Sequence, residues 1–178
     1  MDKKQALKNL DKMSDEELIG KILTGEKKLF EVLIRKYNDR LFRIGMTIIN
    51  NNIEVEDIMQ TVYVNAYENL SKFKKRSSFG TWIIRIMINE SLLQLKRKQR
   101  YVSMEVGSLE AKNVLNKSFA TQLPSNFVIN KELTKVLENA LAELPDKYQL
   151  IFVMRIIENM TTGETAEVLG YYRSKCQD

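Results

Sequence analysis

Apolar residues along this chain recur every three or four positions, the spacing that places them on one face of an α-helix. We predict helices wherever this pattern holds, at about residues 26–50, 54–70, 79–100, 133–144 and 146–158. Only two prolines and seven glycines occur in 178 residues, so few positions would interrupt a helix. The pattern therefore predicts an all-α protein.

Two further short helices are predicted from the residues that would open them. Ser14 is followed by Glu17, and Thr161 by Glu164, and this spacing of three is typical of the capping box at a helix N-terminus. Gly170 comes where glycine commonly follows the last helical residue. We therefore expect the second of these helices to end just before Gly170.

The helical pattern weakens in the middle of the chain. Residues 101–129 contain recurring Ser, Asn and Gly and little apolar spacing, so we interpret them as a flexible linker. The chain is thus predicted to form two small helical domains, one in residues 1–100 and the other in residues 130–178.

Charge is distributed unevenly along the chain, whose formal net charge is +5. No Lys or Arg occurs from Ile44 to Ser71, although several acids do. Residues 72–100, by contrast, hold nine Lys or Arg and a single acid, Glu90. An acidic helix beside a strongly basic segment indicates two partners of different chemistry.

The composition argues against several classes of function. The chain has no histidine and one cysteine, so neither a zinc site nor a Ser–His–Asp catalytic set is expected. No glycine-rich phosphate loop occurs either, and we predict a protein that is not an enzyme and has no catalytic residues, metal or cofactor. No apolar run approaches the ~20 residues of a membrane span. The single cysteine fits a reducing compartment, so a cytoplasmic protein without membrane insertion is expected.

The basic segment, residues 72–100, has the residue types that bind single-stranded nucleic acid. Its cations cluster at its two ends and aromatic residues lie among them. Trp82, Asn89 and Lys96 are seven apart and share one helical stripe, which combines a stacking ring, an amide that can read a base edge and a cation for phosphate. The alternative is that the cations form a solvated face and that Trp82 belongs to the core.

Asp57, Gln60 and Thr61 gather on the polar side of the acidic helix, with no lysine in that helix to pair with them. Such a face is available to a basic partner surface. By itself, the pattern is equally typical of an ordinary amphipathic helix with one solvated side.

Three segments in order resemble the second region of bacterial RNA polymerase sigma factors of the sigma-70 superfamily, above all the extracytoplasmic-function group: "LIRKYNDRLFRIG", "EVEDIMQTVYVNAYENL" and "KFKKRSSFGTWIIRIMINESLLQLKRKQR". A later segment resembles the start of their fourth region, including the first helix of its helix-turn-helix: "LENALAELPDKYQLIFVMRIIENMTTGETAEVLG". The resemblance implies a sigma factor that binds the polymerase core and directs promoter recognition and opening.

The resemblance implies that the acidic helix binds the clamp helices of the largest polymerase subunit. By matching positions, the residues at this core-polymerase contact are Tyr37, Arg40, Asp57, Gln60 and Thr61. An anti-sigma factor is a further possible partner for a member of this group.

The resemblance also implies that the basic segment opens the minus-ten promoter element and holds its non-template strand. Phe73 and Asn89 match positions that line a pocket for a flipped-out base. The cations would engage phosphates, which makes binding salt-dependent. The implied DNA-binding residues are Phe73, Lys74, Lys75, Arg76, Ser77, Phe79, Trp82, Arg85, Asn89, Lys96, Arg97 and Arg100.

The chain departs from the family pattern at its end. In the family a recognition helix follows and lies in the major groove at the minus-thirty-five element. Here only the eight residues Tyr171 to Asp178 follow Gly170, and they do not match. We expect an incomplete helix-turn-helix that recognises the minus-thirty-five element poorly. An incomplete sequence, a frameshift and a natural variant remain open as explanations.

Two other functions compete with the sigma-factor interpretation. One is a stand-alone DNA-binding regulator with a helix-turn-helix, and the other is a scaffold protein. The unmatched recognition helix and the acidic face count against the first. A base-reading pocket would be superfluous in the second.

Overall fold

A computed structural model describes residues 13–105 and 131–170 of the chain. These residues form helices joined by short turns, and none of them lies in a strand, so the all-α prediction is confirmed. The elements, in chain order, are α2 (Asp15–Leu23), α3 (Leu29–Ile49), α4 (Asn52–Glu68), the 3₁₀ turn η1 (Leu70–Lys72), α5 (Phe79–Glu105), α6 (Lys131–Ala142), α7 (Asp146–Phe152), the π-helical turn η4 (Val153–Ile157) and α8 (Thr162–Leu169).

Both predicted capping boxes are present. At α2, the Glu17 backbone N–H donates to Ser14 Oγ at 3.2 Å, and the Ser14 N–H donates to Glu17 Oε2 at 2.9 Å. The same reciprocal pair joins Thr161 and Glu164 at α8. An N-cap side chain is worth about 1 kcal/mol relative to alanine, so these residues stabilise the first turn of each helix. Gly170 ends α8 in the left-handed conformation (φ 77°), as predicted.

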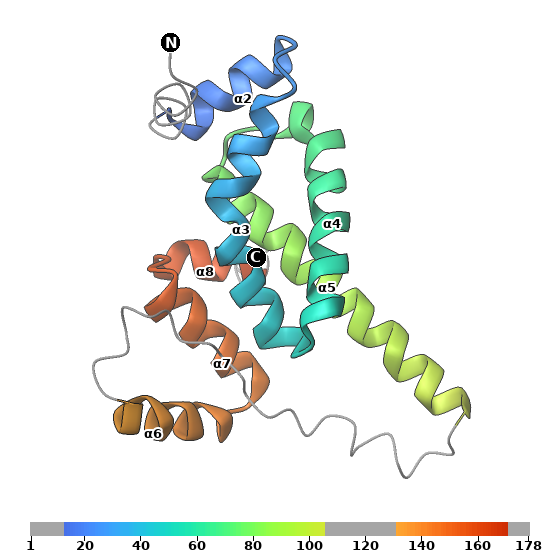
Figure 1. Ribbon diagram of the computed structural model, residues 1–178, viewed down its shortest axis with the longest axis vertical. Helices are drawn as coiled ribbons and strands as arrows, with labels where there is room; N and C mark the ends of the chain where they lie inside the picture. Colours follow the sequence, from blue (N-terminus) through green and yellow to red (C-terminus); the bar gives the residue numbers. More distant parts are fainter. Residues whose placement is uncertain (1–12, 106–130, 171–178) are drawn as a thin grey trace, which may run out of the picture.

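Helices α3, α4 and α5 pack on one another and enclose the largest part of the core (Figure 1). Gly45 of α3 makes their close approach possible. A Cβ atom built on Gly45 would overlap the side chains of Met87 on α5 and Val55 on α4, so a larger residue at this crossing would force these side chains to shift. The helical spacing of apolar residues on α4 corresponds to its buried face, which consists of Val55, Ile58, Val62, Ala66 and, just beyond the helix, Leu70.

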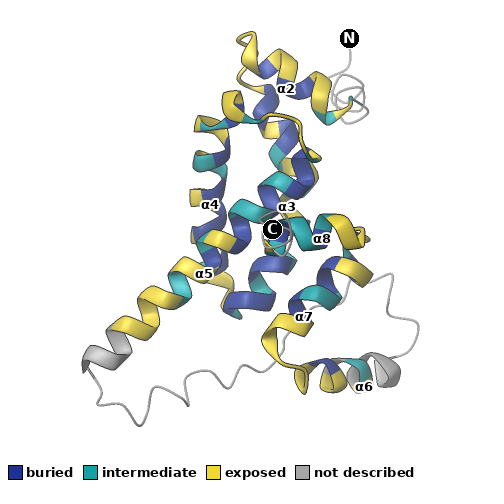
Figure 2. Cartoon of the chain, turned by 180° about the vertical axis from the view of Figure 1, so that it is seen from behind, coloured by how far each residue is buried: buried dark blue, intermediate teal, exposed yellow. Residues whose placement is uncertain are grey.

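The helices after residue 131 pack directly against the first group. Leu150, Val153, Met154 and Ile157, from α7 and η4, belong to the same continuous core as the residues of α3 and α5. In Figures 1 and 2 the helix α3 lies between α4 on one side and α7 and α8 on the other. The sequence pattern predicted two helical groups, and the structure adds that the two are docked on each other.

Three features of the helices differ from the sequence prediction. Helix α5 continues to Glu105, five residues beyond the predicted end, so the start of the predicted linker is helical; residues 106–130 lie outside the described residues. The predicted helix at 146–158 is interrupted, because α7 ends at Phe152 and a π-helical turn follows. Leu92 and Leu93 of α5 follow the helical spacing of core residues, but they are 44% and 42% exposed. The outer part of α5 extends beyond its neighbours and is largely exposed (Figure 2).

Candidate functional site

Three aromatic side chains join the basic loop, residues 73–78, to the start of α5. The ring centroids of Phe73 and Trp82 are 5.3 Å apart, and both rings lie within 6 Å of Phe79, at 5.9 and 5.6 Å. Phe79 is buried, whereas Phe73 and Trp82 are half-buried. Aromatic pairs of this kind contribute about 0.5–1.5 kcal/mol beyond their buried area. The loop is therefore held on α5 by an aromatic cluster in which Phe73 and Trp82 remain half-buried.

A cavity of about 190 Å³ lies between this loop and α2. Phe73, Lys75 and Ser77 line it from the loop, and Asp15 and Glu16 line it from α2. Lys75 Nζ lies 3.5 Å from Glu16 Oε2 across the opening. The structure thus brings together several predicted DNA-binding residues, and it adds two carboxylates that no sequence motif indicated.

The cations predicted to contact phosphate lie on the surface. Lys74, Arg76, Lys96 and Arg97 are exposed, and none of the four forms a salt bridge within the described part of the chain. Arg100, at the far end of the same helix, is also exposed. Lys74, Arg76, Lys96 and Arg97 can therefore bind an anionic polymer without first breaking a salt bridge.

The predicted stripe along α5 is only partly free. Asn89 is exposed, as base reading would require. Arg85, one turn earlier, is half-buried and donates a hydrogen bond to the backbone carbonyl of Glu167 at the end of α8. Helix α8 therefore covers the stripe at Arg85 and leaves Asn89 open.

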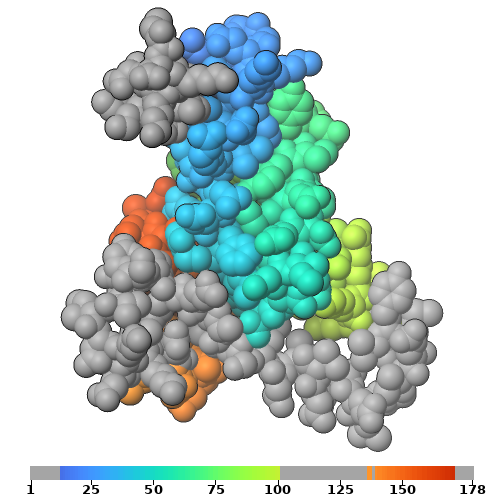
Figure 3. Space-filling model, viewed as in Figure 1, coloured from blue at the N-terminus to red at the C-terminus, as the bar shows by residue number. Residues whose placement is uncertain are grey.

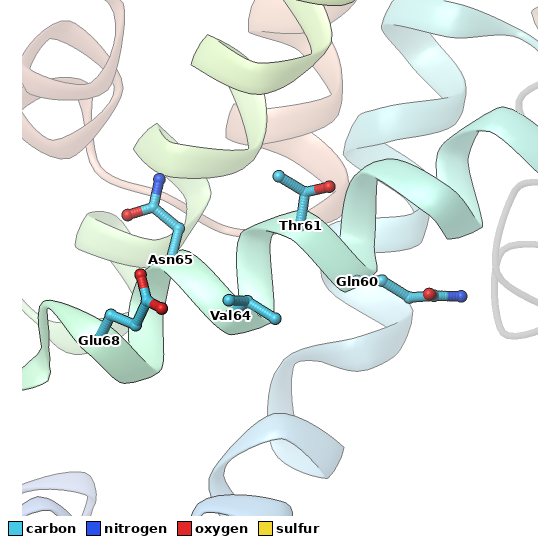
Figure 4. A pocket seen from close by; sticks show the side chains of 5 residues that line it. All are labelled: Gln60, Thr61, Val64, Asn65 and Glu68. Carbon is cyan, nitrogen blue, oxygen red and sulfur yellow. The ribbon is translucent and has the colours of Figure 1, made fainter.

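The polar face of α4 forms a second surface. Asp57, Gln60 and Thr61 are all exposed, and Asp57 has no salt bridge within the described residues. A shallow depression runs beside them and is lined by Gln60, Thr61, Val64, Asn65 and Glu68. In Figure 4 all five side chains arise from α4, and Thr61 and Asn65 project to the same side of it.

Apolar side chains accompany this polar face. Val64 is 59% exposed and Tyr67 is 38% exposed. Neither was predicted as a site residue, although Val64 lies one helical turn from Gln60 and Tyr67 lies two turns from it. A surface of carboxylate, amide and hydroxyl groups around exposed apolar side chains is suited to a protein partner that offers both cations and apolar groups.

Tyr37 and Arg40 do not join the trio on α4. They lie on α3, on the side that faces α2 and the end of η4. The Tyr37 hydroxyl donates a hydrogen bond to Asp15, and its ring packs on Phe79 with 5.4 Å between centroids. Burial, together with Asp15, raises the pKa of the Tyr37 hydroxyl well above its usual value. In this conformation Tyr37 and Arg40 are therefore both engaged by other residues of the same chain.

Glu158 is the partner of Arg40, and sequence reasoning did not identify it. Its side chain is only 4% exposed, and it lies against Arg40 and Arg43 of α3. Arg43 Nε donates to Glu158 Oε1 at 2.6 Å, and Arg40 Nη2 donates to the Glu158 backbone carbonyl at 3.0 Å. Arg40 and Glu158 are 118 positions apart, and no sequence pattern indicates that two such distant residues form a pair.

No helix in the described ranges combines the length and the apolar character that a membrane span requires. The same residues contain no cluster of three or more His, Cys, Asp or Glu side chains arranged to hold a metal ion.

Comparison with known proteins matches both predicted regions. The family model for sigma-70 region 2 matches residues 33–101, and that for sigma-70 region 4 matches residues 134–171. The ECF RNA polymerase sigma factor SigW of Bacillus subtilis is 27% identical over 155 residues, covering 85% of this chain and 83% of that protein. The ECF RNA polymerase sigma-E factor of Escherichia coli K12 is 23% identical over 162 residues, covering 89% and 84%.

A solved structure supports the fold. The chain superposes with a TM-score of 0.56 on the structure of CnrH in complex with the cytosolic domain of CnrY, at 20% identity, covering 88% of this chain and 82% of that one. The region 2 match argues against a stand-alone helix-turn-helix regulator, because the matched residues include both the acidic helix and the basic segment. The chain belongs to the extracytoplasmic-function group of the sigma-70 family, and it is a sigma factor that binds RNA polymerase and directs it to promoters.

Proposed function

We propose that this sigma factor uses two separate faces of region 2, one for the polymerase core and one for promoter DNA. The exposed face of α4, with Asp57, Gln60 and Thr61, would bind the clamp helices of the largest polymerase subunit. The observation that carries this proposal is that these three polar side chains are exposed and lie beside a shallow, partly apolar depression. Clamp helices that offer cations would find an acceptor in Asp57.

The DNA face would consist of the basic loop and the outer side of α5. Exposed cations at both ends of this segment would hold the phosphates of the non-template strand at the minus-ten element. The cavity beside Phe73 has room for one unstacked base. Flipping a base costs a few kcal/mol, and contacts with Phe73 and the loop hydroxyls would offset that cost. Asn89 would contact a neighbouring base edge from α5.

The remaining assignments follow from this role. The protein would work in the cytoplasm, need no cofactor and have no catalytic activity of its own, because the polymerase performs the chemistry. An anti-sigma factor would be a further partner. The similar solved chain, CnrH, is itself in complex with a protein segment, the cytosolic domain of CnrY.

Two substitutions with opposite outcomes test the assignment of the faces. Asp57→Arg should abolish binding to core polymerase while binding to a single-stranded minus-ten oligonucleotide persists. Asn89→Ala should weaken binding to the oligonucleotide and promoter opening while core binding persists. A matched control is Glu26→Arg, which reverses an exposed acid outside α4 and should change neither. If Asn89→Ala instead lost core binding, the division into two faces would be wrong.

A further inference from the structure

We propose that Asp15 of α2 selects the base that enters the cavity beside Phe73, and that it favours a base with an exocyclic amino group over thymine. This inference rests on the proposed function of the cavity, and it adds the chemistry of the base. Helix α2 lies at one end of the molecule, next to the start of α3 (Figure 3). It precedes residue 33, where the match to the sigma-70 region 2 model begins, so the matched residues do not include this wall of the cavity.

The two walls of the cavity differ in chemistry. The basic loop and the start of α5 contribute the rings of Phe73 and Phe79, whereas α2 contributes the carboxylates of Asp15 and Glu16. A base stacks on an aromatic ring through its face and forms hydrogen bonds through its edge. A base that lies against the aromatic wall can therefore direct its edge toward α2.

Asp15 is held in a fixed position on the α2 wall. One of its oxygens, Oδ1, lies 3.2 Å from Lys36 Nζ, and the other accepts a hydrogen bond from the Tyr37 hydroxyl. The Tyr37 ring packs on Phe79, which in turn packs on Phe73. The carboxylate and the aromatic wall are thus connected through one side chain. A polar group whose position is fixed by such supporting contacts can discriminate between ligands, because it does not move to suit each of them.

The Asp15 carboxylate still has capacity to bind a ligand. Its side chain is 25% exposed, and a carboxylate oxygen has two lone pairs, of which Lys36 and Tyr37 occupy one on each oxygen. Lys36 also offsets the negative charge of Asp15, which reduces its repulsion of DNA phosphates. Asp15 is therefore placed to accept a further hydrogen bond from the cavity.

An ionised carboxylate only accepts hydrogen bonds, and this property decides which base fits. The amino groups at N4 of cytosine and N6 of adenine donate, whereas thymine has the carbonyl oxygen O4 at the corresponding position. A carbonyl oxygen facing Asp15 would place two acceptors together with no proton between them. Specificity of this kind comes from the unfavourable contact of the rejected ligand as much as from the contact of the accepted one.

Glu16 has a different role from Asp15. Its carboxylate is mostly exposed and lies 3.5 Å from Lys75 Nζ, so it holds Lys75 at the opening of the cavity. The backbone of Lys75 is in the left-handed region (φ 53°), which is uncommon for a residue other than glycine. An exposed ion pair contributes little free energy, so Lys75 can exchange Glu16 for a phosphate when a strand arrives. We therefore assign the choice of base to Asp15 and not to Glu16.

A comparison of two single strands tests the assignment in the full chain. Oligodeoxycytidine and oligodeoxyuridine of equal length differ at each base only in the amino or carbonyl group at C4. Fluorescence anisotropy at neutral pH and one low salt concentration should show that the parent chain binds the cytosine strand at least about fivefold more tightly. Asp15→Asn should abolish this difference, because its amide can donate to a carbonyl as well as accept from an amine.

The control makes the same change of charge elsewhere. Asp39 is an exposed acid of α3 that does not line the cavity, so Asp39→Asn should keep the preference for cytosine. The ratio of the two affinities is the quantity compared, since removal of any acid strengthens binding to both strands alike. A parent chain that binds both strands equally, or a preference that survives in Asp15→Asn, would overturn the proposal.

A measurement on the parent chain decides the question if Asp15→Asn loosens α2. The backbone amide resonances of Asp15 and Ile19, which both line the cavity, should shift more with the cytosine strand than with the uracil strand in NMR spectra. Equal shifts would contradict the role of Asp15. A parent chain that binds neither strand would instead contradict the proposed DNA face, and this inference with it.

Discussion

Glu158 lies between Arg40 and Arg43, and its backbone carbonyl also accepts a hydrogen bond from Arg40 at 3.0 Å. Arg40 Nε approaches the carboxylate at 3.1 Å without the alignment of a hydrogen bond, so that link is an ion pair. One acidic residue at the end of η4 thus satisfies two cations of α3 and holds the two regions of the chain together.

Removal of this carboxylate should destabilise the protein. In Glu158→Ala the guanidinium groups of Arg40 and Arg43 keep part of their exposure and regain some solvation, so we expect a loss of about 1–3 kcal/mol in the free energy of unfolding. Urea unfolding monitored by circular dichroism measures it. Glu143→Ala, at an exposed position, should stay within about 0.5 kcal/mol of the parent. If the two variants were equally stable, the pairing of Glu158 with Arg40 and Arg43 would make no net contribution to the free energy of unfolding.

Two glycine substitutions should have opposite effects. Gly45→Ala places a methyl group against Met87 and Val55 and should cost about 1–3 kcal/mol through overpacking of the helix crossing. Gly20→Ala is the matched control, because it lies in helix α2 with open space around it and should stabilise the protein by about 0.5–1 kcal/mol. Thermal unfolding of both variants measures the difference. A Gly45→Ala protein as stable as the parent would contradict the described crossing of α3, α4 and α5.

The cap of α8 should be visible in an acid titration. Hydrogen bonds from the Thr161 N–H and hydroxyl hold the pKa of Glu164 below its ordinary value of 4.5. Because the pKa is depressed in the folded state, the stabilisation is fully present above pH 4.5 and is lost as the pH falls through the folded-state pKa. Thr161→Ala removes the hydroxyl and keeps the backbone N–H, so side-chain NMR titration should show the pKa of Glu164 rising only part of the way toward 4.5. The neighbouring Thr162→Ala should leave it depressed. An unchanged pKa in Thr161→Ala would rule out the Thr161 hydroxyl as a cause of the depressed pKa.

Phosphate contacts should appear in the salt dependence of DNA binding. Lys96 is exposed on the outer part of α5, so Lys96→Ala should reduce the slope of log affinity against log salt by about one and weaken all sequences alike. Lys147→Ala, an exposed lysine on α7, serves as the control and should leave the slope unchanged. Fluorescence anisotropy with a minus-ten oligonucleotide across a salt series gives both slopes. An unchanged slope for Lys96→Ala would remove Lys96 from the DNA face.

Local features of this fold were predictable from the sequence because each depends on residues a few positions apart. The capping boxes at Ser14 and Thr161 and the αL glycine at Gly170 were predicted at the residues where they occur. The buried face of α4 was predicted from its periodicity. In each case a short stretch of chain determines the geometry, so no knowledge of tertiary packing was needed.

The features that escaped prediction depend on packing. Leu92 and Leu93 have the spacing of core residues, but at this point α5 packs on its neighbours through Ser91 and Leu95, and Leu92 and Leu93 stay partly exposed. The π-helical turn after Phe152 interrupts the predicted helix, and no residue type in this segment indicates it. The pairing of Glu158 with Arg40 joins residues 118 positions apart and depends on how the two regions dock. For the same reason Arg85, which the family resemblance implied as a DNA-binding residue, is found against α8.

The most direct test of the central claim is the binding of the full chain to RNA polymerase core at low salt, measured by size-exclusion chromatography with quantified band intensities. We predict a complex of one chain per core enzyme for the parent protein and for the control Glu26→Arg, and no complex for Asp57→Arg. A parent chain that fails to bind the core enzyme at low salt, or an Asp57→Arg protein that binds as well as the parent, would contradict the assignment of the α4 face to the polymerase.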